Sequence, residues 1–147
     1  MTKVTKSIEI NSPPEKIFAF MISDKMNDIW GRWMEGKWTS NGPVGIGSVG
    51  HFVAKPDFKI KGEWDEEVTE FEENKKFVMK TVEGSKMKLG VTGLLEPTAK
   101  GTKVTYIDEY QVPYSVFGKL MDKLVLRKDT EKFMEEVMNN LKKALET

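Results

Sequence analysis

The sequence predicts an α+β fold, in which an antiparallel β-sheet of about six strands precedes one long C-terminal helix. Residues 3–11 alternate between apolar and polar side chains, which is the period of a half-buried strand. Residues 48–112 contain strand-like segments at roughly ten-residue spacing, separated by polar turns. Residues 115–145 then change to helical periodicity. No repeat or linker interrupts the pattern, so we expect a single domain over residues 1–147.

The first strand is expected to lead into two small helices. On the strand, Val4, Ile8 and Ile10 share one face. The Asn-Ser-Pro-Pro-Glu stretch that follows offers a capping residue, prolines suited to a first helical turn and an acid that the helix dipole favours. Ser23 and Asp24 offer a second cap, which predicts another short helix after them.

A segment rich in glycine and tryptophan follows. Its irregular pattern predicts a loop that carries three large apolar side chains, Trp30, Trp33 and Trp38. Residues 45–50 read Gly-Ile-Gly-Ser-Val-Gly and match the dinucleotide-binding motif G-x-G-x-x-G. That motif needs a strand before it and a helix after it, whereas here a loop precedes it and a strand-like stretch follows. We therefore interpret these glycines as a loop that enters a strand.

Two strands of the predicted sheet have an inward face that is apolar except for one acid. Alternation places Glu66 on the same face as Trp64, and it places Asp108 between Tyr106 and Tyr110. An inward carboxyl group must be solvated, hydrogen-bonded or neutral. For Asp108 two interpretations stay open. Either a cavity supplies water or a polar ligand group, or the side chain bonds a neighbouring tyrosine in a strand of uncertain register.

The C-terminal helix carries two apolar stripes that do not line up. The first includes Phe117, Met121 and Leu124, and the second runs over residues 133–141. Either the helix bends near residues 126–129, or its second half faces different neighbours. A straight helix of about 31 residues would span roughly 46 Å at 1.5 Å per residue, which is long for a compact domain of this size and favours the bend.

Composition excludes several classes of protein. Lys plus Arg and Asp plus Glu each number 23, and the basic residues are scattered, so we expect no nucleic-acid partner. The chain has no cysteine, and its one histidine, His51, lies on a predicted strand, so we expect no metal site and no cofactor. No apolar run reaches the roughly 20 residues of a membrane span, and no signal sequence is evident, which predicts a cytoplasmic protein without a membrane span.

Several stretches together carry a resemblance to a known family. Residues 8–18 run from a strand through a double-proline turn into an amphipathic helix, and residues 30–34 bear two tryptophans. Residues 42–48 form a glycine loop, and residues 101–106 enter the last strand. With the helical stretch 117–142, they resemble the START-like (SRPBCC) superfamily, and most of all its polyketide cyclase/dehydrase and lipid transport-like branch.

The resemblance implies a helix-grip fold, in which a curved antiparallel sheet wraps around the long C-terminal helix and leaves a cavity between them. The superfamily uses this cavity for sterols, lipids, polyketides, quinones or hormones, and it shares no set of catalytic residues. On this basis the ligand-binding residues are expected to be Trp64, Met79, Leu89, Tyr106, Asp108, Tyr110, Phe117, Met121 and Leu124, with Trp30 and Trp33 near the mouth.

Three functions stay open on the sequence alone. We favour binding or carriage of a small hydrophobic molecule (a lipid, polyketide, quinone or similar), because the inward faces are rich in aromatic and methionine side chains and poor in acid–base groups. The first alternative is an enzyme of the polyketide cyclase, aromatase or dehydratase type, with Asp108, Tyr106 or Tyr110 moving protons. The second is a protein-interaction module of the chaperone-activator type that uses the open sheet or the tryptophan loop.

Overall fold

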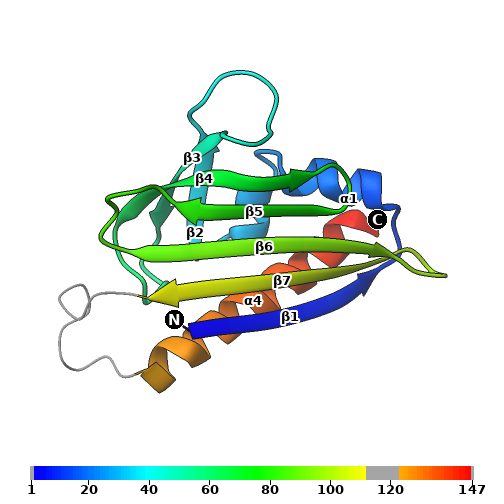
Figure 1. The fold of residues 1–147 in the computed structure, drawn as a ribbon. Coiled ribbons are helices and arrows are strands. Elements are labelled where there is room, and N and C mark those ends of the chain that lie inside the picture. The colour runs from blue at the N-terminus through cyan, green and yellow to red at the C-terminus, as the bar shows by residue number, and fades with distance from the viewer. Residues whose placement is uncertain (1, 112–122, 147) are drawn as a thin grey trace.

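A seven-stranded antiparallel sheet curves around one long helix in the computed structural model, which describes residues 2–111 and 123–146 (Figure 1). The strand order is β1-β7-β6-β5-β4-β3-β2. The strands are β1 (Thr2–Ile10), β2 (Met34–Trp38), β3 (Val49–Ala54), β4 (Glu63–Glu72), β5 (Lys76–Thr81), β6 (Lys88–Pro97) and β7 (Thr102–Gln111). The expected α+β architecture is confirmed, with seven strands in place of about six.

Strand β2 lies where the sequence predicted only a loop. It pairs with β3, and its Gly36 lies opposite Phe52. A Cβ atom on Gly36 would come within 2.5 Å of the Phe52 ring, so this glycine makes room for an aromatic side chain. Glycine interrupts the alternation of a strand and weakens its sequence signal, which explains why β2 was not predicted. The loop proper is confined to residues 39–48, between β2 and β3.

Two short helices, α1 (Pro14–Met21) and α2 (Met26–Trp30), follow β1 as predicted. The expected side-chain cap of α1 is absent, because Pro13 takes the N-cap position. Ser12 instead lies buried in the turn before the helix, where its carbonyl oxygen accepts a hydrogen bond of 2.8 Å from the Thr102 hydroxyl. The turn after β1 is thus attached to the start of β7 and not to α1.

Helix α4 (Lys123–Leu145) lies across the concave face of the sheet (Figure 1). Its buried side chains recur every three or four residues in one stripe, namely Leu126, Thr130, Phe133, Met134, Val137, Met138, Leu141 and Leu145. Near its C-terminal end, Lys142 Nζ donates to the carbonyl oxygen of Glu9 at 2.9 Å, and Glu146 accepts a hydrogen bond from the backbone N–H of Asn11. These contacts fix the helix against the end of β1.

The expectation that Leu124 faces the interior is wrong. Two residues advance a helix by about 200°, so Leu124 lies well away from the stripe that begins at Leu126. Its side chain is 59% exposed. Phe117, Met121 and the expected helix start near residue 115 lie outside the described residues, so the bend near residues 126–129 stays a prediction. No helix among the described residues has the length and hydropathy needed to cross a membrane.

Candidate ligand cavity

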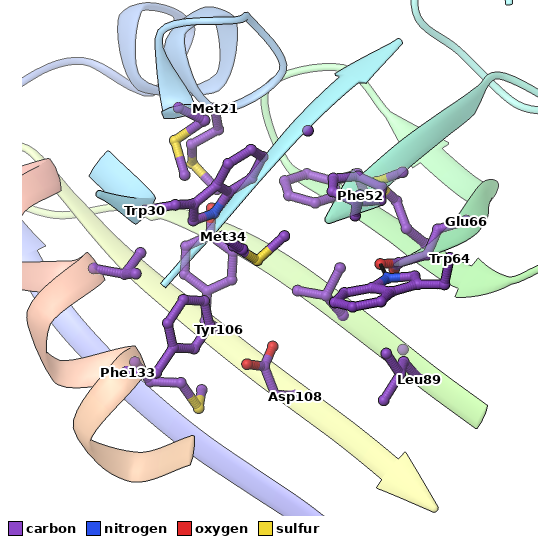
Figure 2. Close-up of a pocket in the computed structure, with 18 of the residues that line it drawn as sticks. Met21, Trp30, Met34, Phe52, Trp64, Glu66, Leu89, Tyr106, Asp108 and Phe133 are labelled. Atoms are coloured by element: carbon purple, nitrogen blue, oxygen red, sulfur yellow. Dashed lines mark hydrogen bonds between the residues drawn. The ribbon is translucent and has the colours of Figure 1, made fainter. Parts of the chain in front are cut away.

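A cavity of about 150 Å³ lies between the sheet on one side and helices α1, α2 and α4 on the other (Figure 2). A closed apolar cavity of similar volume can hold a benzene molecule. Just over half of the residues of the wall are aromatic or methionine, namely Met21, Met26, Trp30, Met34, Trp38, Phe52, Phe58, Trp64, Phe77, Met79, Tyr106, Tyr110, Phe133, Met134 and Met138. Because these side chains come from both the sheet and the helices, the whole fold shapes the cavity.

The sheet contributes to the cavity in rows of side chains that cross from strand to strand. In one row Asp108 lies opposite Val91, and Val91 lies opposite Met79. In the next row Tyr110 lies opposite Leu89. All five residues line the cavity. The predicted register of the last strand is therefore correct, because a shift of one residue would turn Asp108 to the outer face.

Three aromatic rings form a continuous wall on the β2–β4 side. Trp30 meets Phe52 edge to face, with ring centroids 5.9 Å apart, and Phe52 stacks on Trp64 at 6.4 Å. Such contacts stabilise packed aromatic clusters beyond the area that they bury. The ring of Phe52 also occupies the space above Gly36 described above. These three rings therefore give the cavity a largely aromatic side.

Two carboxyl groups point into this largely apolar space (Figure 2). Glu66 on β4 is only 7% exposed and accepts a hydrogen bond of 2.7 Å from the Trp64 indole. Burial raises the pKa of Glu66 to about 7, although the Trp64 hydrogen bond opposes the rise. Burial also raises the pKa of Asp108 on β7 to about 7, and the charge of Glu66 adds to this effect. Near neutral pH, both carboxyl groups are thus poised between their charged and neutral forms.

Two tyrosines flank Asp108 on β7. Burial raises the pKa of Tyr106 above its ordinary value, and the charge of Asp108 raises it further. The Tyr110 hydroxyl is also buried, and it lacks a hydrogen-bond partner in the described part of the chain. The hydroxyls of Thr2 and Thr130 are near enough to lower the pKa of Tyr110 slightly, while burial raises it more. Both phenols therefore stay neutral and can donate a hydrogen bond.

The structure brings together most of the residues expected to bind a ligand. Seven of them line the cavity, namely Trp30, Trp64, Met79, Leu89, Tyr106, Asp108 and Tyr110. Phe117 and Met121 lie outside the described residues, and Leu124 is exposed on α4. Ligand contact by the residues that line the cavity stays a prediction.

Trp33 is not near the mouth of the cavity, contrary to expectation. It is 3% exposed and lies among the rings of Phe58 and Phe133, each with its centroid 5.6 Å away. The guanidinium group of Arg32 lies 4.4 Å from the centre of the Trp33 ring, and the Trp33 indole N–H donates a hydrogen bond to Glu136. Trp33 is therefore a core residue that packs behind the cavity wall.

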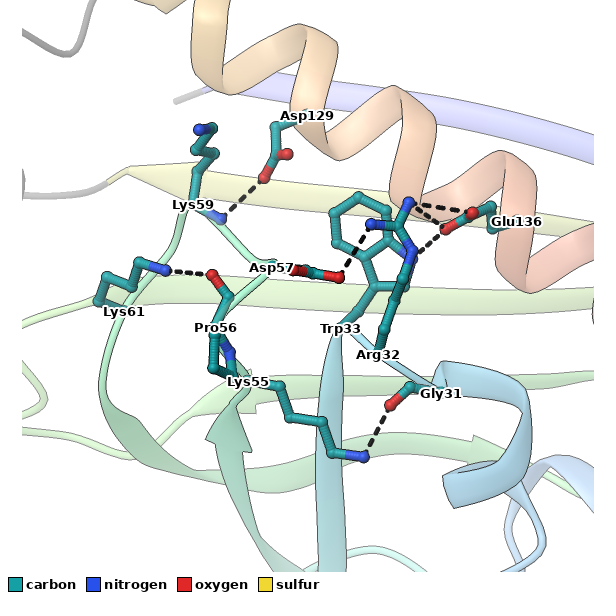
Figure 3. Close-up of polar contacts among 10 residues, drawn as sticks. All are labelled: Gly31, Arg32, Trp33, Lys55, Pro56, Asp57, Lys59, Lys61, Asp129 and Glu136. Atoms are coloured by element: carbon teal, nitrogen blue, oxygen red, sulfur yellow. Dashed lines mark hydrogen bonds and ion pairs between the residues drawn. The ribbon is translucent and has the colours of Figure 1, made fainter.

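Polar contacts on the outside hold one end of the cavity together (Figure 3). Arg32 forms ion pairs of 3.0 Å with both Asp57 and Glu136, and so joins the loop between β3 and β4 to α4. Asp129 on α4 accepts a hydrogen bond of 2.9 Å from the backbone N–H of Lys59 in the same loop. Because this loop supplies Phe58 and Ile60 to the wall, its attachment to α4 encloses the cavity at this end.

His51 lies on the outer face of the sheet, away from the cavity. Its Nδ1 atom is 2.7 Å from an oxygen of Asp65, and Glu63 lies 3.7 Å from its other ring nitrogen. Both acids are on β4, where strand alternation places them on the face opposite Trp64. Among residues 2–111 and 123–146, no group of three or more His, Asp or Glu side chains is placed to hold a metal ion.

Glu66 is the important cavity residue that the expected ligand-binding set lacks. Alternation had already placed it on the inward face with Trp64, so the signal was present in the sequence. Met34 was also missed because β2 was not predicted, and Phe52 was missed although a strand was expected at its position on β3. The residues from α1 could not be assigned to the cavity from periodicity, because a helix face has no partner until the fold is known.

Comparison with known proteins identifies the family. The model of a family described as polyketide cyclase/dehydrase and lipid transport matches residues 1–146. The chain belongs to this family. A search of the curated proteins finds no significant match. The curved antiparallel sheet with its long C-terminal helix is the fold that a START superfamily protein also has.

Several solved structures share the fold at low sequence identity. The protein TTHA0849 from Thermus thermophilus is 20% identical, with a TM-score of 0.76 over 98% of this chain and 97% of that one. A START superfamily protein from Mycobacterium smegmatis is 15% identical, with a TM-score of 0.75 over the same shares. Ginseng major latex-like protein 151 from Panax ginseng is 15% identical, with a TM-score of 0.70 over 98% and 97%. At these identities the likeness concerns the fold alone.

Proposed function

We propose that this protein binds a small hydrophobic molecule in the cavity between its sheet and α4, as a carrier or store of that molecule. The observation that carries the proposal is the wall itself, an aromatic and methionine-rich surface around a cavity of about 150 Å³. Methionine side chains adapt to the shape of a ligand, and aromatic faces bury large apolar areas. Membership of a family described by lipid transport agrees with this proposal.

The proposal predicts saturable uptake of a neutral, environment-sensitive dye with a single ring, such as 4-(dimethylamino)benzonitrile, which suits a cavity of this size. Val91→Trp is expected to weaken dye binding at least tenfold. Val91 lines the cavity from the sheet, opposite Asp108 and Met79, and the larger tryptophan side chain would fill the space. Val53→Trp is the matched control. Val53 follows Phe52 on β3, is absent from the cavity wall and should tolerate the same change without effect on the dye.

Two measurements test this prediction: the fluorescence titration, and mass spectrometry of organic extracts from the purified protein. Thermal unfolding of both variants shows that each is folded. The proposal fails if the wild-type protein takes up no dye, carries no extractable molecule and shows no saturable response to a panel of fatty acids, sterols and quinones. It also fails if Val91→Trp and Val53→Trp bind the dye equally.

Catalysis in the same cavity is a second candidate function, and the paired carboxyl groups favour it. A general acid or base works best with a pKa near the working pH, and burial raises the pKa values of Glu66 and Asp108 to about 7. The neutral phenols of Tyr106 and Tyr110 lie beside Asp108 and can donate hydrogen bonds to a reacting oxygen. A cyclisation or dehydration of a bound polyketide needs such groups and no metal.

Asp108→Asn separates the two functions. In an enzyme of this type the variant is expected to lose at least a hundredfold in turnover of a polyketide-like substrate and to keep its affinity, because proton transfer is lost while shape is kept. In a carrier the variant changes affinity only. Turnover by the wild-type protein is followed by product chromatography. Equal turnover by wild type and Asp108→Asn would exclude Asp108 as the acid or base.

A further inference from the structure

The two acids of the cavity approach it from different strands. Glu66 is on β4 and Asp108 is on β7, with β5 and β6 between these strands. Neighbouring strands lie about 4.8 Å apart, so three such spacings separate the two backbones. Because the sheet is curved, both side chains on its concave face turn toward the centre of the cavity. Figure 2 shows both carboxyl groups directed into the same space. A ligand in this space therefore meets an acid from two sides.

The described residues give these two acids one hydrogen bond and no ion pair. Glu66 receives one hydrogen bond, from Trp64, and Asp108 has neither a hydrogen bond nor an ion pair with any described residue. The other titratable side chains of the wall are Tyr106, Tyr110, Asp24 and Lys37. Asp24 and Lys37 are exposed at the surface, and Lys37 is the one basic residue among the described residues of the wall. As far as the described residues form it, the interior of the cavity is therefore acidic and has no buried base.

We propose that the cavity selects a ligand with a protonated amine, which Glu66 and Asp108 hold while its apolar body lies against the aromatic wall. This inference rests on the proposed function and names the chemical class of the ligand. An ammonium group would donate further hydrogen bonds to both acids and would place a positive charge beside them. The faces of Phe52, Trp64 and Tyr106 favour a cation further. A carboxylate head would add a third negative charge to the same space.

The probes are two series of compounds, each with one apolar body and three different head groups. The first body is a ring, in 2-phenylethylamine, 2-phenylethanol and 3-phenylpropanoate, which suits a cavity that is large enough for benzene. The second body is a chain, in decylamine, decanol and decanoate. Displacement of 4-(dimethylamino)benzonitrile and isothermal titration measure the affinity of each. With both bodies, the amine is expected to bind at least tenfold more tightly than the alcohol, and the alcohol more tightly than the acid.

Two variants and two matched controls test the role of the acids. Glu66→Gln and Asp108→Asn are each expected to weaken amine binding at least tenfold and to change alcohol binding less than threefold. Glu67→Gln and Glu109→Gln change the neighbouring residues on the same strands, which point away from the cavity, and should leave both affinities unchanged. Thermal unfolding of each variant confirms that it is folded.

The pH dependence in wild-type protein provides a test that needs no variant. Amine affinity is expected to rise at least fivefold from pH 5.5 to 8, because the two acids lose their protons over this range while the amine keeps its own. Alcohol affinity should change little. The inference is overturned if the alcohols bind as tightly as the amines, if no amine binds, or if Glu66→Gln and Asp108→Asn leave amine affinity unchanged. Tight alcohol binding would still support the proposed function, whereas a protein that takes up no dye, carries no extractable molecule and responds to no ligand of the panel would remove both.

Discussion

Leu141→Asp is expected to destabilise the protein by more than about 4 kcal/mol, enough to unfold most domains of this size. The Leu141 side chain is completely buried near the C-terminal end of the stripe that α4 turns toward the sheet. An aspartate at this position has no basic partner in the hydrophobic core cluster, so its charge is buried unpaired or its pKa must rise greatly. Chemical denaturation followed by circular dichroism measures the loss.

Leu124→Asp is the matched control, because it makes the same substitution on the same helix. Leu124 is 59% exposed, so the new carboxylate stays in water and the free energy of unfolding should change by less than about 1 kcal/mol. A large loss from both substitutions would show that residue 124 is buried after all. A small loss from Leu141→Asp would contradict the packing of α4 on the sheet.

The free energy of unfolding is expected to fall by at least about 2 kcal/mol as the pH rises from 5 to 8. The folded protein holds the pKa values of Glu66 and Asp108 near 7, whereas in the unfolded chain they return to about 4.5 and 3.8. Between these limits the folded state binds more protons than the unfolded state, so raising the pH favours unfolding. The contribution is complete below about pH 4 and is lost as the pH passes 7.

The same experiment on two variants assigns the effect to a residue. Glu66→Gln removes one titrating group and keeps an acceptor for the Trp64 indole, so the pH profile should flatten and stability at pH 8 should rise. Glu67→Gln alters an exposed acid on the same strand and should reproduce the wild-type profile. Glu146 and Glu136 have lowered pKa values, so their effects fall on the acid side of this range. A flat wild-type profile would contradict the burial of the two acids.

Periodicity predicted most of the fold, because most elements of this chain show one dominant period. The alternation in β1, β4 and β7 places their inward residues correctly, and the helical pattern in the last quarter of the chain predicts α4. It failed at β2, where a glycine stands in place of an inward side chain and the ring of Phe52 fills the gap. It also failed at Leu124, whose apolar character does not reveal that the buried stripe begins at Leu126.

The cavity could be predicted only in part, because it depends on which elements face one another. Strand alternation was enough to turn Asp108 and Tyr110 inward. Strand alternation could not predict where Trp33 lies, because its position behind the wall depends on contacts with Phe58 from a loop and Phe133 from α4. Glu66 and Asp108 face the same cavity because of the order of the strands in the sheet. No local sequence pattern predicts that order.

The position of β1 in the sheet has a consequence for biosynthesis. In the described sheet β1 pairs with β7 alone. Ile10 at the end of β1 pairs with Thr102 at the start of β7, so about ninety further residues must be translated before β1 can meet its partner strand. At about 5–20 residues per second, this wait lasts on the order of 5–20 seconds on the ribosome. Strands β2 to β7 can form their hairpins in the order in which they emerge. The nascent β1, with its row of apolar side chains, must meanwhile be kept from pairing with other chains.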